Sequence, residues 1–334
     1  MSRVAVVGAG SWGTALSVLL AQAGHEVALW DVDRGHLASL ELFRENRKFL
    51  AGIELPAGIS VQAELEVALA GAGATVFVVP SHALRSAGAA VAATDWSGVA
   101  VCATKGLELG TLERPTQILA AVLGRPDPVL LVGPSHAEEV SRGVPTSVVA
   151  ACADPGRAGE VQRLFSGPRF RVYTNRDVAG CEYGAALKNV IAVAAGVCDG
   201  LGYGDNTKGA LLTRGLAEIA RLGVALGGRQ ETFFGLTGMG DMITTAISRH
   251  SRNRGLGERL GRGESLQEIL GSMVMVAEGV NTARAALDLA RRHGVDMPIT
   301  GQVCAIFDGG GPREALEALM TRELKSEEWK GGAA

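Results

Sequence analysis

A glycine-rich turn near the N-terminus constrains the fold of this chain more than any other feature of the sequence. The apolar run Arg3–Val7 leads into Gly8-Ala9-Gly10-Ser11-Trp12-Gly13, and an Ala- and Leu-rich helical pattern follows. Between a strand and a helix, Gly8, Gly10 and Gly13 permit a tight turn, close approach of the backbone to a pyrophosphate, and close helix packing. The helix N-terminus adds N–H donors for an anion. In a chain with 46 Gly, this position rather than the spacing alone indicates a dinucleotide site, and the alternative is a turn without a ligand.

The first half of the chain alternates short apolar runs with helical patterns. Such runs are typical of strands buried on both faces of a parallel sheet. The alternation predicts a Rossmann-like, doubly wound α/β domain over residues 1–180. The expected strands are Arg3–Val7, Glu26–Trp30, Thr75–Val79, Val99–Cys102, Val129–Val132, Thr146–Ala150 and Arg171–Tyr173. The expected helices are Trp12–Ala23, Arg34–Asn46, Leu65–Ala70, Thr116–Leu123 and Gly156–Phe165.

The strand pattern fades after about residue 180, and Gly-rich breaks then separate helical patterns. Ser265 and Glu268 have the spacing of a capping box in front of one of these helices. We therefore expect an all-helical second domain over residues 181–330. The expected helices are Glu182–Val197, Thr213–Leu226, Gly255–Arg262, Ser265–Leu270, Asn281–Arg292 and Pro312–Met320.

Charge and cysteine content narrow the class of protein. The 32 basic and 35 acidic side chains give a net charge of −3 without a basic tail, so neither a nucleic-acid partner nor an anionic membrane is expected. The five Cys form no C-x-x-C pair, which predicts buried thiols in a reducing cytoplasm and no metal site. The apolar run Val190–Cys198 ends at Asp199 and is too short to span a bilayer.

The end of the second expected strand bears on the choice of cofactor. Asp31 follows Gly13 by 18 residues, close to the spacing of about 20 for a carboxylate on the ribose 2′-hydroxyl. This position favours NAD, whereas Arg34 could accept a 2′-phosphate and favour NADP. An ordinary solvated strand end explains both residues equally simply, so NAD and NADP both stay open.

Only six of the 32 basic residues are Lys, and two of these fall where an amine has a chemical use. Lys105 follows an expected core strand, at the sheet edge where ligands bind, and can reach a phosphate. Lys188 lies in an apolar helical stretch, where burial lowers the pKa of an amine and suits it to acid–base work on an alcohol or ketone. The alternatives are a solvated loop lysine and an ion-paired lysine at a helix end. Lys208 lies in a polar turn, where we expect a structural role.

Several motifs together resemble bacterial-type NAD(P)-dependent sn-glycerol-3-phosphate dehydrogenase over about residues 3–322. They are Gly8–Gly13, Thr104-Lys105-Gly106, Gly133-Pro134-Ser135-His136-Ala137-Glu138-Glu139, Gly184–Asn189, Gly200–Asn206, Gly238–Asp241, His250-Ser251-Arg252-Asn253 and Glu278-Gly279-Val280. The resemblance implies that dihydroxyacetone phosphate is reversibly reduced to sn-glycerol 3-phosphate, a precursor of the phospholipid backbone. It also implies a homodimer, with the helical domain supplying the dimer surface.

The resemblance assigns roles to individual residues. Lys188 matches the catalytic acid/base, Asp241 and Thr245 match its polar neighbours, and Lys105 matches a residue that touches both cofactor and substrate. The other cofactor positions are Ser11, Trp12, Phe49, Ala137, Arg252, Val276 and Glu278. The other substrate positions are Gly133, Ser135, Ser251, Arg252 and Asn253, of which the last three form a phosphate-binding turn.

The residues themselves support these roles but also permit simpler ones. Asp241 can orient the Lys188 amine or merely cap a helix, and Arg252 can bind a phosphate or belong to a solvated basic face with Arg249 and Arg254. We expect structural roles for His136 and His250. Two departures from the family are Val32, where a basic residue is common, and Phe49, which lacks the hydroxyl of the usual Tyr.

Two other classes of protein stay open. A β-hydroxyacid-type dehydrogenase with a helical second domain would have to bind a substrate carboxylate. A non-enzymatic, dinucleotide-binding redox sensor would need neither a titratable Lys on an apolar helix nor a Ser-Arg-Asn turn, and this sequence has both.

Overall fold

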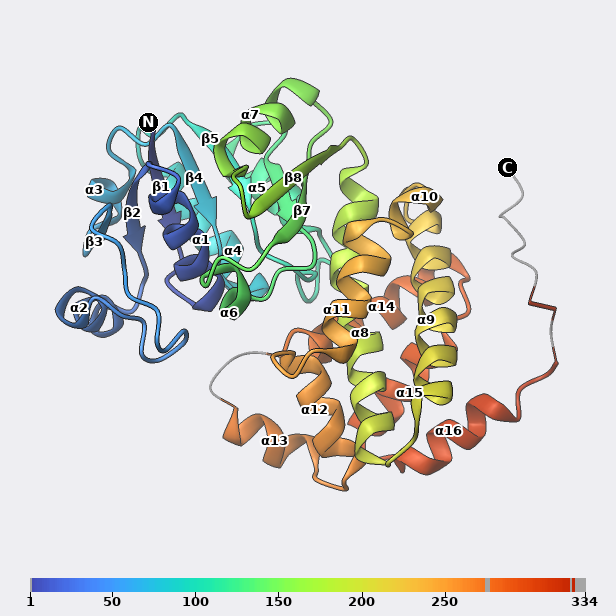
Figure 1. Ribbon diagram of the computed structural model, residues 1–334. Coiled ribbons are helices and arrows are strands. Elements are labelled where there is room, and N and C mark those ends of the chain that lie inside the picture. The colour runs from blue at the N-terminus through green and yellow to red at the C-terminus, as the bar shows by residue number, and fades with distance from the viewer. Residues whose placement is uncertain (1, 274–276, 325, 328–334) are drawn as a thin grey trace.

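The computed structural model describes residues 2–273, 277–324 and 326–327, which form a sheet part and a helical part (Figure 1). One eight-stranded sheet has the order β3-β2-β1-β4-β5-β6-β7-β8. This arrangement confirms the predicted α/β domain. The strands are β1 (Arg3–Val7), β2 (Glu26–Trp30), β3 (Ile59–Gln62), β4 (Ala74–Phe77), β5 (Val99–Cys102), β6 (Val129–Val132), β7 (Thr146–Ala151) and β8 (Phe170–Asn175).

The sheet is parallel except at one place, where β6 and β7 pair antiparallel, with Leu131 opposite Ala150. The connection between them contains only the four-residue helix α6 (Ala137–Val140). A parallel pair needs a crossover that carries the chain back along the sheet, usually through a full helix. This connection instead folds over the sheet edge and leaves Gly133 and Ser135 beside the carboxyl end of β6.

The strand order reverses at β1, which pairs with β2 on one side and β4 on the other. Val4 and Val6 pack into the core on one face of the sheet, whereas Ala5 and Val7 pack into the core on the opposite face. Full burial on both faces explains the continuous apolar run. Ligands bind outside the carboxyl ends of strands at such a reversal, and the glycine turn begins there.

Helices cover both faces of the sheet, as the sequence predicts. The short strand β3 and the helix α4 were missed, because Ile59–Gln62 is a four-residue edge strand and Leu84 and Val91 are the only large apolar residues of α4. The helices of this part are α1 (Ser11–Gln22), α2 (Arg34–Phe43), α3 (Leu65–Leu69), α4 (Leu84–Ala92), α5 (Pro115–Leu123), α6 and α7 (Pro155–Phe165), with the short 3₁₀ turn η1 (Ser81–Ala83) before α4.

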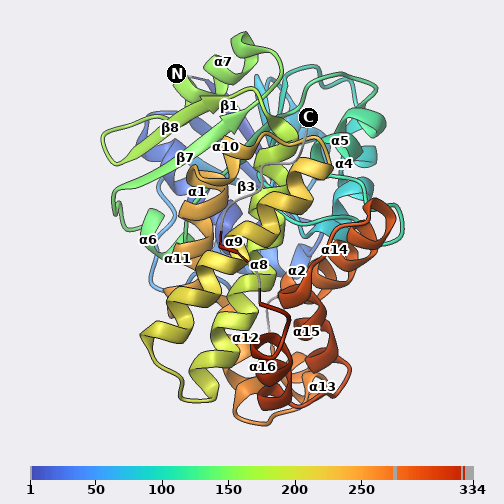
Figure 2. The ribbon, with the colours of Figure 1, turned by 90° about the vertical axis from the view of Figure 1, so that its right-hand side faces the viewer.

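The helical part confirms the predicted all-helical second domain. The helix α8 (Val178–Gly200) runs through its centre beside α9 (Asp205–Ala225), as Figure 2 shows. Lys208 lies in the first turn of α9 rather than in a turn outside a helix, and it pairs with Asp199. The remaining helices are α10 (Gln230–Phe233), the π-helical turn η2 (Leu236–Gly240), α11 (Asp241–Ile247), α12 (Arg252–Gly261), α13 (Leu266–Ser272), α14 (Gly279–His293), α15 (Pro298–Phe307) and α16 (Pro312–Met320).

Four of these elements, α10, η2, α11 and α15, were not predicted. The first three have only four, five and seven residues, which is too short for a helical period to be detected. The capping box of Ser265 and Glu268 is confirmed at the start of α13. By length and composition α8 could cross a membrane, but its apolar window is wholly buried within the protein, as in the core helix of a globular domain.

Glycines let α8 and α12 pack backbone against backbone. A Cβ on Gly257 of α12 would collide with the Val193 carbonyl, and a Cβ on Gly196 of α8 would collide with the Arg254 carbonyl. This close packing brings the N-terminus of α12 beside the middle of α8.

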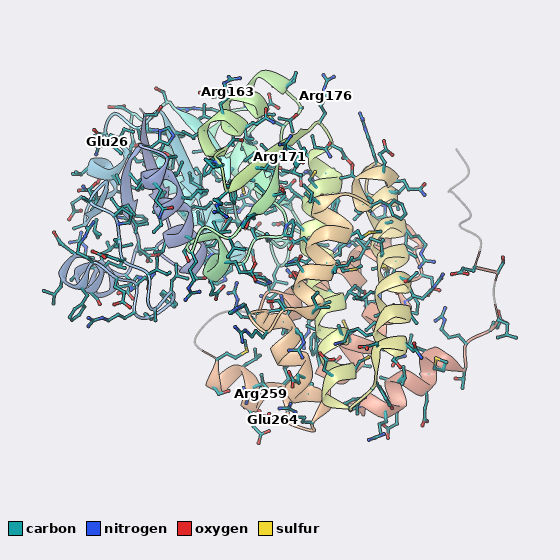
Figure 3. All side chains as sticks on the ribbon, viewed as in Figure 1. Glu26, Arg163, Arg171, Arg176, Arg259 and Glu264 are labelled. Atoms are coloured by element: carbon teal, nitrogen blue, oxygen red, sulfur yellow. The ribbon has the colours of Figure 1, made fainter. Side chains whose placement is uncertain are left out.

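Charged side chains cover the outer surface of the protein. Among them are Arg163, Arg171 and Arg176 around α7 and β8, and Arg259 and Glu264 at the far end of the helical part (Figure 3).

Candidate active site

A pocket of about 430 Å³ lies between the carboxyl edge of the sheet and the helices α8, α11 and α12. It brings together most of the residues that the sequence singled out, from segments more than 200 residues apart. Those in its wall are Gly8, Gly10, Ser11, Trp12, Asp31, Phe49, Lys105, Ser135, Ala137, Lys188, Asp241, Thr245, Ser251, Arg252, Asn253 and Glu278.

Lys188 has its amine held by two groups of α11. Its Nζ donates to Asp241 Oδ1 over 2.9 Å and to Thr245 Oγ1 over 2.5 Å. Asp241 and Thr245 lie one helical turn apart, so both face α8. All three side chains are buried, with relative exposures of 5%, 2% and 4% for Lys188, Asp241 and Thr245. The geometry places a titratable amine at the pocket wall in a fixed position.

Lys105 reaches the same carboxylate from the sheet part. Its Nζ donates to Asp241 Oδ2 over 2.8 Å and to the Gly133 carbonyl over 3.1 Å. Asp241 therefore bridges two lysines, one oxygen to each. Lys105, Asp241 and Lys188 together carry a net positive charge when both amines are protonated, and this charge suits a pocket for an anionic substrate.

Burial and neighbouring charges set the protonation of Lys188 and Asp241. Burial, together with Lys105 and Arg252, lowers the pKa of Lys188 to about 8, although Asp241 opposes the shift. Burial alone would raise the pKa of Asp241, but Lys105 and Lys188 outweigh it and hold that pKa below its usual value. Asp241 thus stays ionised while Lys188 can gain or lose a proton near neutral pH.

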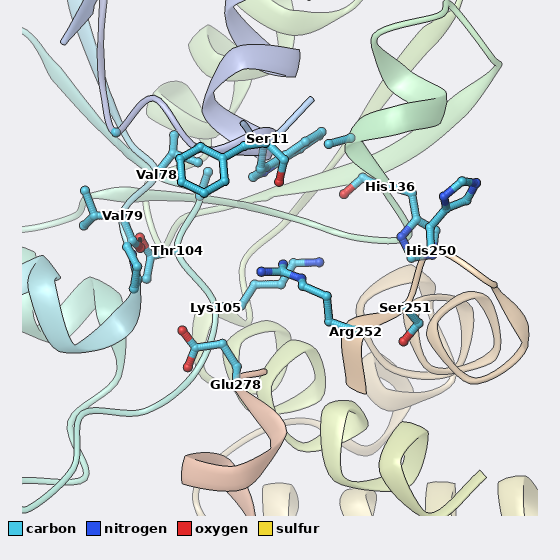
Figure 4. Close-up of a pocket in the computed structure, with 18 of the residues that line it drawn as sticks. Ser11, Val78, Val79, Thr104, Lys105, His136, His250, Ser251, Arg252 and Glu278 are labelled. Atoms are coloured by element: carbon cyan, nitrogen blue, oxygen red, sulfur yellow. Dashed lines mark hydrogen bonds between the residues drawn. The ribbon is translucent and has the colours of Figure 1, made fainter. Parts of the chain in front are cut away.

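The turn Ser251–Asn253 begins α12 at the pocket wall. The Ser251 hydroxyl accepts the Arg254 N–H over 3.2 Å and so caps the helix, while the exposed Arg252 side chain reaches into the pocket (Figure 4). Arg254 pairs with Asp199 over 2.7 Å, so Arg252 and Arg254 do not form one solvated basic face. Arg252 therefore offers a planar cation where an anionic group would enter.

Asn253 is buried and engaged with neighbouring helices. Its Nδ2 donates to Asn189 Oδ1 over 3.0 Å, and its Oδ1 accepts the Gly279 N–H over 2.9 Å. These contacts tie the turn to α8 and to the start of α14. Asn253 thus has a positioning role that its place in the sequence motif does not reveal.

At the other end of the pocket, Asp31 is bound to the glycine turn. Its Oδ2 accepts the Ala9 N–H over 2.7 Å, and Oδ1 accepts the Asp33 N–H over 3.0 Å. Arg34 is not in the pocket wall, and it pairs with Glu64 over 2.9 Å at the surface. This geometry favours Asp31 over Arg34 as the residue that meets the ribose.

The remaining candidates fall into three groups. Gly13 and Gly133 lie outside the pocket wall but hold it in shape, since a Cβ on Gly13 would collide with the Gly8 carbonyl and Gly133 has φ +153° against Val148. Glu278 joins the two parts of the protein by accepting the Ser81 hydroxyl over 3.0 Å. Val276 lies outside the described residues.

Several pocket residues were missed or undervalued by the sequence reasoning. Asp33 and His36 line the pocket without belonging to a predicted motif, and their only signal is proximity to Asp31 in the chain. Asn189 also lines it and ends the motif Gly184–Asn189, but the sequence reasoning gave it no role of its own. His136 and His250 also line it, with ring centroids 6.1 Å apart. Burial and the charge of Lys188 lower the pKa of His136, which disfavours its use as a cation.

Comparisons with known proteins agree with this geometry. Residues 3–158 match the model of the NAD-dependent glycerol-3-phosphate dehydrogenase N-terminus, and residues 177–317 match that of its C-terminus. The chain is 51% identical to glycerol-3-phosphate dehydrogenase (NAD(P)+) of Geobacter sulfurreducens, over 98% of this chain and 99% of that protein. It is also 51% identical to the enzyme of that name from Moorella thermoacetica, over 98% and 99%. A crystal structure of glycerol-3-phosphate dehydrogenase from Coxiella burnetii superimposes with a TM-score of 0.92 at 34% identity, over 96% of this chain and 99% of that one.

Proposed function

The chain belongs to the NAD-dependent glycerol-3-phosphate dehydrogenase family, and from that premise we propose how its pocket catalyses hydride transfer. It is an oxidoreductase that uses NAD or NADP. The substrate pair is dihydroxyacetone phosphate and sn-glycerol 3-phosphate, and the product serves phospholipid synthesis. The observation that carries the proposal is the buried Lys188–Asp241–Thr245 cluster in one pocket with the glycine turn.

Lys188 moves the proton of the reaction. The nicotinamide ring, when bound, supplies or accepts the hydride at substrate C2. As the ketone is reduced, the Lys188 ammonium donates a proton to the oxygen on C2, and in the reverse direction the neutral amine takes the proton from that hydroxyl. Asp241 and Thr245 hold the amine in place, and Asp241 stabilises its protonated form.

The remaining pocket residues bind and orient the substrate and the cofactor. Arg252 and the Ser251 end of α12 bind the substrate phosphate, and Asn253 fixes that turn. Lys105 adds positive charge beside Gly133 and Ser135. At the far end, Ser11, Trp12, Asp31 and Phe49 hold the adenosine diphosphate half of the cofactor, with Ala137 and Glu278 nearer the nicotinamide.

A turnover assay tests this function. Purified protein mixed with dihydroxyacetone phosphate and NADH or NADPH should consume the reduced cofactor, as followed by its nicotinamide absorbance. Running both cofactors in parallel also measures the preference, for which the placement of Asp31 favours NADH. Folded protein that binds both ligands but turns over neither cofactor would contradict the proposal.

We place the division between the domains at about residue 180, between β8 and the body of α8, and propose a cytoplasmic homodimer. Ile243 and Ile247 support the dimer, since they lie one turn apart on α11 and are 40% and 59% exposed. Large apolar side chains exposed on one face of a helix are typical of subunit contacts. Light scattering on the purified protein should give twice the monomer mass, and Ile247→Glu should halve it.

A further inference from the structure

A network of hydrogen bonds connects the two segments that we expect to contact the adenosine diphosphate half of the cofactor. These segments are the glycine turn and the loop after α2. The network centres on the carbonyl of Ala9, inside the glycine turn. Asn46 Nδ2 donates to this oxygen over 2.9 Å, and His36 Nε2 lies 3.0 Å from it. The Ala9 N–H on the same residue is already held by Asp31. Side chains from three separate segments therefore fix the backbone of the turn at Ala9.

Asn46 also reaches away from the glycine turn in two directions. Its Nδ2 donates to the Thr14 hydroxyl in α1 over 2.7 Å, and its Oδ1 accepts the Phe49 N–H over 3.0 Å. The side chain is 0% exposed. Its amide donors and its acceptor are thus all engaged within the protein. A single buried amide connects the turn, the first helix and the backbone of Phe49.

Phe49 is the aromatic side chain that this connection positions. It lines the same pocket as Asp31 and Asp33, and its ring packs edge-on against His36 with centroids 5.1 Å apart. The loop that carries it is anchored at its base by Arg44, which donates to the carbonyls of Pro56 and Ile59 over 2.8 and 2.9 Å. The loop is therefore tied down at its base by Arg44 and at Phe49 by Asn46.

We propose that Asn46 is a positioning residue for the adenosine diphosphate half of the cofactor. It holds the N–H groups of the glycine turn and the ring of Phe49 in one fixed arrangement, so that pyrophosphate and adenosine meet a preformed site. Preformed sites bind more tightly because less ordering is left for the ligand to impose. This inference rests on the dinucleotide binding proposed above, and it adds a residue that does not itself line the pocket.

The variant Asn46→Ala tests the proposal with two ligands, NADH and ADP. Loss of a buried amide that serves three partners should weaken NADH binding about tenfold, and ADP binding by the same factor, because ADP carries the affected half. The KM for dihydroxyacetone phosphate and the kcat at saturating NADH should stay within about twofold, since Lys188 and Arg252 lie at the other end of the pocket. Calorimetry measures both dissociation constants without catalysis.

Gln162→Ala is the matched control. Gln162 also uses its side-chain amide to satisfy a backbone carbonyl in the sheet part, that of Val172 over 2.8 Å, but outside the pocket. It should lose some stability, through one hydrogen bond instead of three, and keep wild-type affinity for NADH and ADP. If Asn46→Ala fails to fold, Asn46→Ser, which keeps a shorter donor, should show the same direction with a smaller factor.

The outcomes separate this inference from the proposed function. Wild-type protein that binds neither NADH nor NADPH would contradict the function itself. Wild-type protein that binds NADH, with an Asn46→Ala variant that binds NADH and ADP equally well, would overturn the role of Asn46 alone. An equal loss for dihydroxyacetone phosphate, or an equal loss in Gln162→Ala, would show a general structural effect and would also overturn it.

Discussion

At the scale of single residues, Asp241 determines what the two pocket lysines can do. One carboxylate oxygen binds Lys188 and the other binds Lys105, so each amine is fixed while a net positive charge remains. Arg could not replace Lys188, because a guanidinium does not release its proton in this pH range. The pKa of Lys188, lowered to about 8 by burial first of all, suits it to the proposed role in both directions of the reaction.

Replacing Lys188 should therefore remove the proton transfer and leave binding intact. We expect both Lys188→Met and Lys188→Arg to lower kcat by about 10²- to 10⁴-fold, because neither side chain can act as acid and base. NADH affinity, measured by fluorescence titration, should change little, since the glycine turn lies at the other end of the pocket. Near-normal turnover by Lys188→Arg would rule out Lys188 as the acid and base.

The two directions of the reaction should show opposite pH dependence. Reduction of the ketone needs protonated Lys188, so its kcat should fall as the pH rises through about 8. Oxidation of the alcohol needs the neutral amine, so its kcat should rise through the same pH. Steady-state assays in both directions from about pH 6 to about pH 10 test this. If kcat instead changed in the same sense with pH in both directions, the change would point to another titrating group or to protein inactivation.

The sequence located the residues that line the pocket better than those that hold them in place. Lys188, Asp241 and Arg252 stand in motifs or in unusual surroundings, so their types and contexts could be interpreted one at a time. Asn46 and Ser81 could not be found in this way, because their roles arise from contacts with Ala9 and Glu278 far along the chain. Arg34 was overvalued because nothing local reveals its pairing with Glu64.

At the scale of elements, the crossing of α8 and α12 positions the proposed phosphate site. We expect Gly257→Ala to force α12 away from α8, because its Cβ would meet the rigid Val193 carbonyl. The free energy of unfolding should fall by about 1–3 kcal/mol, the usual cost of overpacking. The KM for dihydroxyacetone phosphate should rise, since Ser251–Asn253 move with the helix.

Gly255→Ala is the control on the same helix. Nothing lies within 4 Å of a Cβ at Gly255, so this change should leave the KM unaltered. It should stabilise the protein by about 0.5–1 kcal/mol through the better helix propensity of Ala. Urea unfolding followed by circular dichroism measures both variants, and equal stabilities would show that the crossing tolerates a methyl group.

Elements were predicted where their sequences are long and periodic. The apolar strands β1, β2, β5 and β6 matched the structure because burial on both faces leaves a continuous run. The missed helix α11 has seven residues and follows a Gly-rich π-helical turn, so no period is long enough to detect. Its omission mattered, because α11 carries both partners of Lys188.

At the scale of the whole molecule, ion pairs and hydrogen bonds of buried carboxylates connect the sheet part with the helical part. Lys105 follows β5, whereas Lys188 and Asp241 belong to the helical part, so the ion pair from Lys105 crosses between them. Glu182 on α8 likewise accepts the Thr116 N–H over 2.8 Å at the start of α5 and pairs with Arg114. The proposed catalytic cluster thus contains residues of both parts.

Asp241→Asn should reveal this dependence as a loss of stability that varies with pH. In the folded protein the pKa of Lys188 is lowered from 10.5 to about 8, so the unfolded chain binds more protons between these values. The free energy of unfolding therefore rises with pH between about 8 and 10.5. Asp241 raises the pKa of folded Lys188, so its removal lowers that pKa further and the rise begins at a lower pH. We expect a loss of about 3–5 kcal/mol near neutral pH, where the buried Lys188 and the half-buried Lys105 lack their counter-ion, and a smaller loss toward about pH 10. Thermal unfolding by circular dichroism at several pH values measures it. Adding Lys188→Met to Asp241→Asn should flatten most of the dependence, and an unchanged slope in that double variant would show that Lys188 is not its source.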